Sequence, residues 1–280
     1  MNFINTSIRF LIFSNIYVSF SASILAYLSF SLRNSSNFNY VFFVFFSTLF
    51  LYNFNRLKKK SIDLQKKRNH FIEKNYKSLI LFTLVTLIIS LTLFNFVKWP
   101  NWIIFLLMII SILYSIDIKF KNKIILRKFR NIPYIKIFLI SFTWSCITDL
   151  IPSLIIENKI NYNTLIQRFL FVISITIPFD IRDKNIDSNY LKTLPQIFGK
   201  NKSLLISIFL IFVCEVLVFY QFFFLKSISL KNFLVIYFSY EISIVLIYIY
   251  DKIQKNFFMD FTYDGLPIIM GLLFFLSNLN

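Results

Sequence analysis

Long apolar runs dominate the chain, and short polar segments rich in lysine, arginine and asparagine separate them. A helix that crosses a bilayer needs about 20 predominantly apolar residues, because each residue adds about 1.5 Å along the helix axis. Nine stretches approach that length with few charges, so the pattern predicts nine transmembrane helices. In chain order they cover residues 10–32, 38–55, 78–97, 99–116, 137–156, 165–179, 203–225, 232–250 and 265–280.

The composition supports a membrane protein. Hydrophobic residues make up 57% of the 280 positions, against only 3 glycines and 6 prolines, and the mean hydropathy is +0.68. A soluble globular domain of this size is less apolar. We therefore expect an all-α, polytopic integral membrane protein, with residues 1–280 forming a single domain because no segment is long enough to be a linker.

Basic residues indicate the orientation. The N-terminal segment and alternate loops hold 24 of the 30 lysines and arginines, and short cytoplasmic loops retain positive charge. The N-terminus is therefore expected in the cytoplasm and the C-terminus outside, in a bacterial cytoplasmic membrane. The net charge of +17 is then explained by loops facing anionic lipid, and nucleic acid is not an expected partner.

Three carboxylates lie where the sixth apolar run ends. Asp180, Asp183 and Asp187 have helical spacing of 0, +3 and +7, which places them on one stripe about 10 Å long. Hard oxygen ligands of this kind suit Mg²⁺, which usually binds one or two carboxylates together with substrate phosphates. The stripe therefore indicates a magnesium site for a diphosphate. The alternative is that these carboxylates are merely hydrated beside Arg182 and Lys184.

The order of these and other short motifs resembles the UbiA family of intramembrane prenyltransferases. Members have nine transmembrane helices around a cytoplasm-facing cavity, with aspartate-rich motifs after the second and sixth helices. The segment DIRDKNID matches the second motif. Further matching positions are Asn15, Tyr114, Ser115, Trp144, Lys192, Thr193, Pro195, Gly199 and the Asp264–Gly265 pair.

The first aspartate-rich motif departs from the family pattern. Where members carry Asn-Asp-x-x-Asp-x-x-x-Asp, this chain reads LFLYNFNRLKKKSID, with Tyr52, Asn55 and Lys59 at the three aspartate positions. Asparagines offer carbonyl oxygens without negative charge. Basic side chains here could replace the missing ion by clamping a diphosphate, or could simply anchor a cytoplasmic loop. The resemblance implies Asn53, Asn55, Arg56, Tyr114, Lys119 and Lys192 as substrate-binding candidates, although Tyr114 and Lys119 are one residue further apart than in the family.

The function implied by the resemblance is Mg²⁺-assisted transfer of a prenyl group from a prenyl diphosphate to a lipophilic acceptor, aromatic or lipid. Two alternatives remain open: a catalytically silent relative that binds isoprenoid or lipid, and a membrane transporter. A transporter would use mid-helix carboxylates such as Glu215 and Glu241 as a proton relay. Glycine and proline are scarce inside the apolar runs, whereas transporters place their sites on broken helices.

Overall fold

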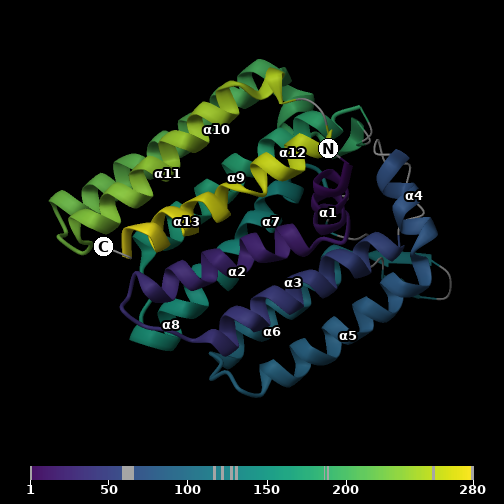
Figure 1. Ribbon diagram of the computed structural model, residues 1–280, viewed down its shortest axis with the longest axis horizontal. Coiled ribbons are helices and arrows are strands. Elements are labelled where there is room, and N and C mark those ends of the chain that lie inside the picture. Colours follow the sequence, from purple (N-terminus) through teal and green to yellow (C-terminus); the bar gives the residue numbers. More distant parts are fainter. Residues whose placement is uncertain are drawn as a thin grey trace.

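The protein folds as a bundle of long helices that lie side by side (Figure 1). The structure is a computed structural model that describes residues 2–58, 66–115, 118–120, 123–126, 129, 132–185, 187, 189–253 and 256–278. Its helices are α1 (Asn2–Phe13), α2 (Ile16–Ser31), α3 (Phe38–Lys58), α4 (Lys66–Lys74), α5 (Tyr76–Phe94), α6 (Asn101–Ser115), α7 (Ile135–Ser145), α8 (Ile151–Glu157), α9 (Tyr162–Asp183), α10 (Leu194–Phe223), α11 (Leu230–Tyr248), α12 (Asn256–Tyr263) and α13 (Leu266–Asn278).

Neighbouring helices contact one another in a nearly closed ring. α7 packs against α9, α9 against α10, α10 against α11, and α11 against α13. The ring continues through α2 and α3 to α5, while α6 contacts α7. Leu25, Ile151 and Ile177 are fully enclosed inside it. On the outer faces Leu81 and Phe209 are more than 60% exposed, as expected for side chains that contact lipid.

Six helices in the described part of the chain are long and apolar enough to cross a membrane, or seven if the bent pair α1–α2 counts as one span. The protein is therefore an integral membrane protein. The expected count of nine is not confirmed, because among the described residues α6 has only 15 residues and α3 is not one of the qualifying helices. The qualifying spans are Tyr76–Phe94, Ile135–Glu157, Tyr162–Asp183, Leu194–Phe223, Leu230–Tyr248 and Phe258–Asn278.

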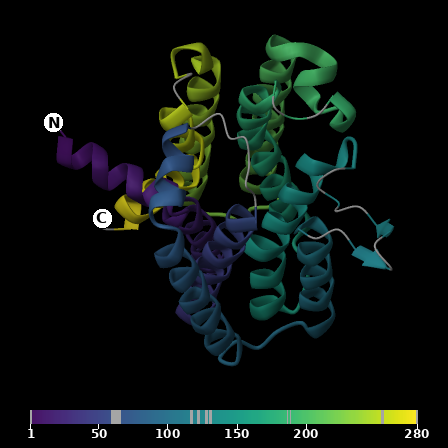
Figure 2. The ribbon, with the colours of Figure 1, turned by 90° about the vertical axis from the view of Figure 1, so that its right-hand side faces the viewer.

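A short hairpin departs from the all-α expectation. Strands β1 (Ile118–Phe120) and β2 (Lys123–Leu126) pair antiparallel after α6. They project to one side of the helices (Figure 2). Isoleucine and phenylalanine favour extended backbone, but these positions lie in a basic loop whose lysines and arginines dominate the sequence pattern.

The bend between α1 and α2 is held by a residue of α3. Asn15 has a φ of 62°, and the two helices meet at 71°. The side chain of Asn53 donates through Nδ2 to the carbonyl oxygens of Ser14 and Leu49, both at 3.0 Å. Its Oδ1 accepts a 2.8 Å hydrogen bond from Nδ2 of Asn15. The amide of Asn53 is therefore fully used within the fold.

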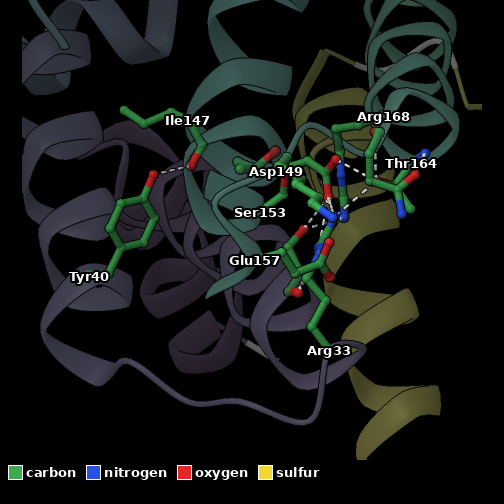
Figure 3. Close-up of polar contacts among 12 residues, drawn as sticks. Arg33, Tyr40, Ile147, Asp149, Ser153, Glu157, Thr164 and Arg168 are labelled. Carbon is green, nitrogen blue, oxygen red and sulfur yellow. Dashed lines mark hydrogen bonds and ion pairs between the residues drawn. The ribbon is translucent and has the colours of Figure 1, made fainter. Parts of the chain in front are cut away.

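A π-helical turn, Cys146–Leu150, connects α7 to α8 within one span. The hydroxyl of Tyr40 donates a 2.5 Å hydrogen bond to the carbonyl oxygen of Ile147 in this turn (Figure 3). Asp149, in the same turn, is 1% exposed. The structure therefore buries this carboxylate among the polar side chains of Ser29, Arg33 and Thr164.

Candidate functional site

A cavity of about 420 Å³ opens between α2, α3, α6, α7 and α9. This volume is typical of a site for a small molecule. Leu107, Ile110, Leu139 and Ile140 contribute to an apolar wall. The charged side chains that line the cavity are the basic residues Arg56, Arg68, Lys136 and Arg182 and the acidic residues Asp180, Asp183, Asp187, Asp260 and Asp264. One space thus combines apolar walls with a dense group of charges.

Lys136 joins two of the three predicted carboxylates. Its Nζ lies 2.7 Å from Oδ1 of Asp180 and 2.8 Å from Oδ2 of Asp187. The side chains of Lys136 and Asp180 are 12% and 4% exposed, so this pair is shielded from bulk water. Lys136 lies in the first turn of α7 and Asp180 in the last turn of α9, two helices that pack against each other.

The ammonium of Lys136 is the single cation that Asp180 and Asp187 both contact. Two carboxylates and substrate phosphates are a common ligand set for Mg²⁺, so the donor chemistry of this pair fits the ion. Within the described residues no group of three or more acidic, histidine or cysteine side chains could hold a metal. Asp180 and Asp187 are therefore the residues that would hold Mg²⁺, and its remaining ligands would come from outside the chain.

Asp183 has a different partner from the other two aspartates. Nε of Arg182 donates to Oδ1 of Asp183 at 2.7 Å, and Nη1 of the same guanidinium donates to Oδ1 of Asp260 at 2.7 Å. Arg68 lies 3.6 Å from the other oxygen of Asp260 and donates to Oδ1 of Asn15 at 2.7 Å. A second charged group, from α4, α9 and α12, therefore lies beside the Lys136 group.

The start of α10 holds the end of the aspartate segment in place. α9 ends at Asp183, and the predicted helical stripe is completed by a turn in which the amide of Asp187 donates to the carbonyl of Asp183 at 2.9 Å. Nε2 of Gln196 donates to the carbonyl oxygens of Asp187 at 3.0 Å and Lys184 at 3.5 Å. Oε1 of Gln196 accepts from the amide of Thr193 at 2.9 Å.

These contacts explain the pattern of Lys192, Thr193, Pro195 and Gly199 in structural terms. Thr193 is the N-cap of α10 and Pro195 lies in its first turn, where proline is well tolerated. Gly199 has φ 78° and ψ 174°, a non-helical conformation that kinks α10. This region is nearly exclusive to glycine. The motif therefore shapes the first turn that holds Asp187.

The first-motif candidates divide between cavity and interior. Tyr52, Asn55 and Arg56 line the cavity. Asn53 does not, because its side chain holds the α1–α2 bend. Lys59 lies outside the described residues. Asn55 and Arg56 of α3 thus share a cavity with the Asp180 group of α9, whereas the other predicted asparagine does not.

Of the other predicted substrate-binding residues, one lines the cavity, one lies outside it and one has no described side chain. Tyr114 of α6 lines the cavity. Lys192 is exposed and places its Nζ 5.8 Å from the ring centre of Tyr134, and it is not part of the lining. Lys119 belongs to β1, where only the backbone is described. Trp144 and Tyr17 also line the cavity, and the hydroxyl of Tyr17 donates to the carbonyl of Phe261 at 3.0 Å.

Two important charged residues were not singled out from the sequence. Lys136 follows a basic loop in the sequence, although it is the single charge in the segment IKIFLISFTWS. Asp260 lies four positions before Asp264, a spacing that puts both on one side of a helix. An isolated charge at the start of an apolar helix and an i, i+4 carboxylate pair were the available signals.

Comparisons with known proteins address the fold. No family model and no curated protein matches the sequence. A solved UbiA homologue from Archaeoglobus fulgidus, bound to GPP and Mg²⁺, matches with a TM-score of 0.60 and 16% identity over 95% of this chain and 98% of its own. A structure of digeranylgeranylglyceryl phosphate synthase matches with a TM-score of 0.56 and 18% identity over 96% of each chain. The chain therefore has the fold of the UbiA prenyltransferases.

Proposed function

We propose that this protein binds a prenyl diphosphate in the 420 Å³ cavity and transfers its prenyl group to a lipophilic acceptor. The proposal rests mainly on one observation: two helices far apart in the sequence line the same cavity. α3 contributes Asn55 and Arg56 to this cavity, and the side chains of Lys136 and Asp180 line it as well. The apolar wall suits an isoprenoid chain, and the charged group suits a diphosphate. The shared fold with a UbiA homologue bound to GPP and Mg²⁺ supports this assignment.

The basic side chains would hold the diphosphate. A guanidinium binds two phosphate oxygens at once, whereas an ammonium acts as a compact charge. Arg56 approaches from α3, and Lys136 and Arg182 approach from the opposite helices α7 and α9. A diphosphate between them would exchange some carboxylate contacts of Lys136 and Arg182 for phosphate contacts.

The charge balance favours a metal ion that accompanies the substrate. Among the described lining residues, four are basic and five are acidic, which leaves one net negative charge when all are ionised. A diphosphate would add several negative charges to a poorly hydrated space, which is unfavourable without further positive charge. We propose that Asp180 and Asp187 hold Mg²⁺ in the place of the Lys136 ammonium. Bound there, the ion would neutralise charge that develops on the departing diphosphate.

The residues that line the cavity support the proposed transfer as follows. The bond between the allylic carbon and the diphosphate oxygen breaks, and its electron pair leaves with the diphosphate, whose charge Arg56, Lys136 and Arg182 stabilise. The rings of Tyr52, Tyr114 and Trp144 face the same cavity. They would lower the energy of the allylic cation by cation–π contact and keep water away from it. The acceptor forms the new bond with its own electron pair and then loses a proton.

The decisive experiment separates binding from turnover. Purified full-length protein in detergent is supplied with radiolabelled GPP, Mg²⁺ and a membrane lipid extract as the source of acceptor. We expect labelled lipid and free diphosphate, with both reduced about 100-fold or more in Asp180→Asn. The same yield of labelled lipid from Asp180→Asn and from the original chain would overturn the role of this carboxylate, and no binding of GPP would overturn the proposal.

A second candidate is binding without turnover. It is favoured by α3, which presents Tyr52 and Asn55 to the cavity at two of the three aspartate positions of the first motif. Such a protein would retain GPP in the cavity, and Asp180→Asn would change its affinity, yet no diphosphate would be released with any acceptor. The same assay therefore separates the two candidates.

A further inference from the structure

A second cavity, of about 320 Å³, lies at the other end of the bundle. α9 contributes to both cavities: its first half, with Thr164, Arg168 and Phe171, lines this one, and its second half, from Val172 to Asp183, lines the cavity described above. α2, α10, α11 and α13 complete the lining. The two spaces are therefore separate parts of one bundle.

Part of the polar lining is a complete ion pair. Arg33 lies 3.1 Å from Oδ1 of Asp149, and their side chains are 7% and 2% exposed. Arg33 also donates to Oγ1 of Thr164 at 3.0 Å and to the carbonyl of Ser29 at 2.8 Å. The second oxygen of Asp149 accepts from Thr164 at 2.7 Å. Arg33, Asp149 and Thr164 converge in Figure 3, and Glu157 lies beside Arg33.

Arg168 lies next to this pair but lacks an acidic partner. Its Nη2 donates to Oγ of Ser29 at 3.2 Å, and that hydroxyl already donates to Asp149. No described carboxylate lies within 4.0 Å of the guanidinium. Glu157 contacts Arg33 instead and is 41% exposed. Because a guanidinium has five N–H donors, most of those of Arg168 have no acceptor among the described residues.

Two buried side-chain amides line the cavity beside Arg168. Gln167 is 5% exposed, and its Nε2 has no hydrogen-bond partner within the described part of the protein. Gln221 is 3% exposed. An unpaired buried donor costs about 1–3 kcal/mol, so the amide of Gln167, next to a guanidinium without an ion pair, indicates a ligand rich in acceptors.

We infer that the second cavity binds the oxyanion headgroup of an anionic lipid. A phosphate or carboxylate would supply a negative charge opposite the guanidinium of Arg168. Its oxygens can also accept two hydrogen bonds from this planar group. The amides of Gln167 and Gln221 would donate to the remaining oxygens. Leu28, Leu32, Val235 and Phe274 give the cavity an apolar wall for a chain of the same molecule. This site is independent of the proposed prenyl transfer.

Thermal unfolding of the full-length protein in neutral detergent tests the inference. Phosphatidylglycerol, phosphatidylcholine and inorganic phosphate are titrated separately. We expect phosphatidylglycerol to raise the unfolding temperature in a saturable manner and phosphatidylcholine to have no such effect. Phosphatidylglycerol and inorganic phosphate raising it equally would identify a free oxyanion, rather than a lipid, as the source of the same chemistry.

Three variants locate the effect. Arg168→Gln should weaken the apparent affinity for phosphatidylglycerol about tenfold or more. Gln167→Leu should weaken it too, while the lipid-free protein stays at least as stable because an unpaired donor is removed. Lys231→Gln, an exposed position at the start of α11 outside the cavity, is the matched control for loss of positive charge. The inference would be wrong if Gln167→Leu and Lys231→Gln bound phosphatidylglycerol with equal affinity. It would also be wrong if phosphatidylglycerol did not raise the unfolding temperature of the unmodified protein.

Discussion

Lys136 and Asp180 form a 2.7 Å ion pair that joins the start of α7 to the end of α9. The same ammonium lies 2.8 Å from Asp187. Without this lysine the two carboxylates would repel each other in a poorly hydrated site. The lysine thus supplies positive charge in the unliganded protein to the two carboxylates that would hold the proposed metal ion.

Replacing this lysine should make folding stability depend on Mg²⁺. In Lys136→Gln the two carboxylates lose their shared cation, and breaking a buried ion pair costs about 3 kcal/mol or more. We expect a lower unfolding temperature in the presence of a chelator and recovery when Mg²⁺ is added. Differential scanning fluorimetry in detergent measures both.

The control for this variant is Lys202→Gln, at an exposed position in α10. It removes the same charge far from the carboxylate pair and should respond to neither chelator nor Mg²⁺. The original chain should also respond weakly, because Lys136 already occupies the site. If the unfolding temperature of Lys136→Gln did not change when Mg²⁺ was added, the assignment of Asp180 and Asp187 as a cation site would be contradicted.

Asn53 and Asn55 should separate stability from binding. Asn53→Ala removes hydrogen bonds to Ser14, Leu49 and Asn15, at a cost of about 1–3 kcal/mol. Its unfolding temperature should fall while its affinity for GPP changes little. Asn55→Ala should do the reverse. Equilibrium binding of labelled GPP together with thermal unfolding measures the pair, and a lower affinity in Asn53→Ala without a lower stability would refute this division.

Arg56 and Lys192 should differ in their effect on substrate affinity. Arg56 lines the cavity, whereas Lys192 is exposed above the ring of Tyr134. Losing one charge-assisted contact to a phosphate costs roughly 1.5–3 kcal/mol, so Arg56→Gln should weaken GPP binding about tenfold or more. Lys192→Gln should bind like the original chain. Isothermal titration calorimetry provides the comparison, and equal losses in both variants would contradict the geometry.

The kink in α10 should be sensitive to a single methyl group. A Cβ at Gly199 would meet no atom within 4 Å, so the cost of Gly199→Ala comes from the backbone alone. At φ 78° and ψ 174° that cost is about 1–3 kcal/mol. Thermal unfolding should show the loss, whereas Lys202→Ala, beyond the kink, should show little. If Gly199→Ala were as stable as Lys202→Ala, the kink would not be required.

The apolar pattern identified the chain as a membrane protein and located most of its long helices. It could do so because the thickness of the bilayer sets the length of a spanning helix, and an apolar run of that length is visible in the sequence. The pattern also drew attention to Asp180, Asp183 and Asp187, since charges at the end of an apolar run are conspicuous, and the structure brings Asp180 and Asp187 together around Lys136. Lys136 was harder to recognise. It lies 44 positions from Asp180, and its isolated place at the start of an apolar helix does not reveal which carboxylates it contacts until α7 and α9 are packed together.

The division between Asn53 and Asn55 depends on rotation about a helix axis. Two positions differ by about 200° in an α-helix, so neighbouring asparagines two apart must face nearly opposite directions. The sequence LYNFNR does not state which faces the cavity, because both sides of α3 pack against other helices. The role of Asp149 depended in the same way on Arg33, which is 116 positions away.

The contact between Gln196 and Asp187 makes the position of Asp187, a proposed metal ligand, depend on the length of the segment that joins it to α10. Gln196 belongs to the first turn of α10, yet its amide holds the carbonyl oxygens of Lys184 and Asp187. Most connections between helices accept insertions and deletions with little effect. This one should not, because one added or removed residue between Asp187 and Thr193 would change the offset between the α10 cap and the carboxylate that it positions. Natural variation in loop length is therefore expected elsewhere in such proteins, and this short connection should keep a constant length.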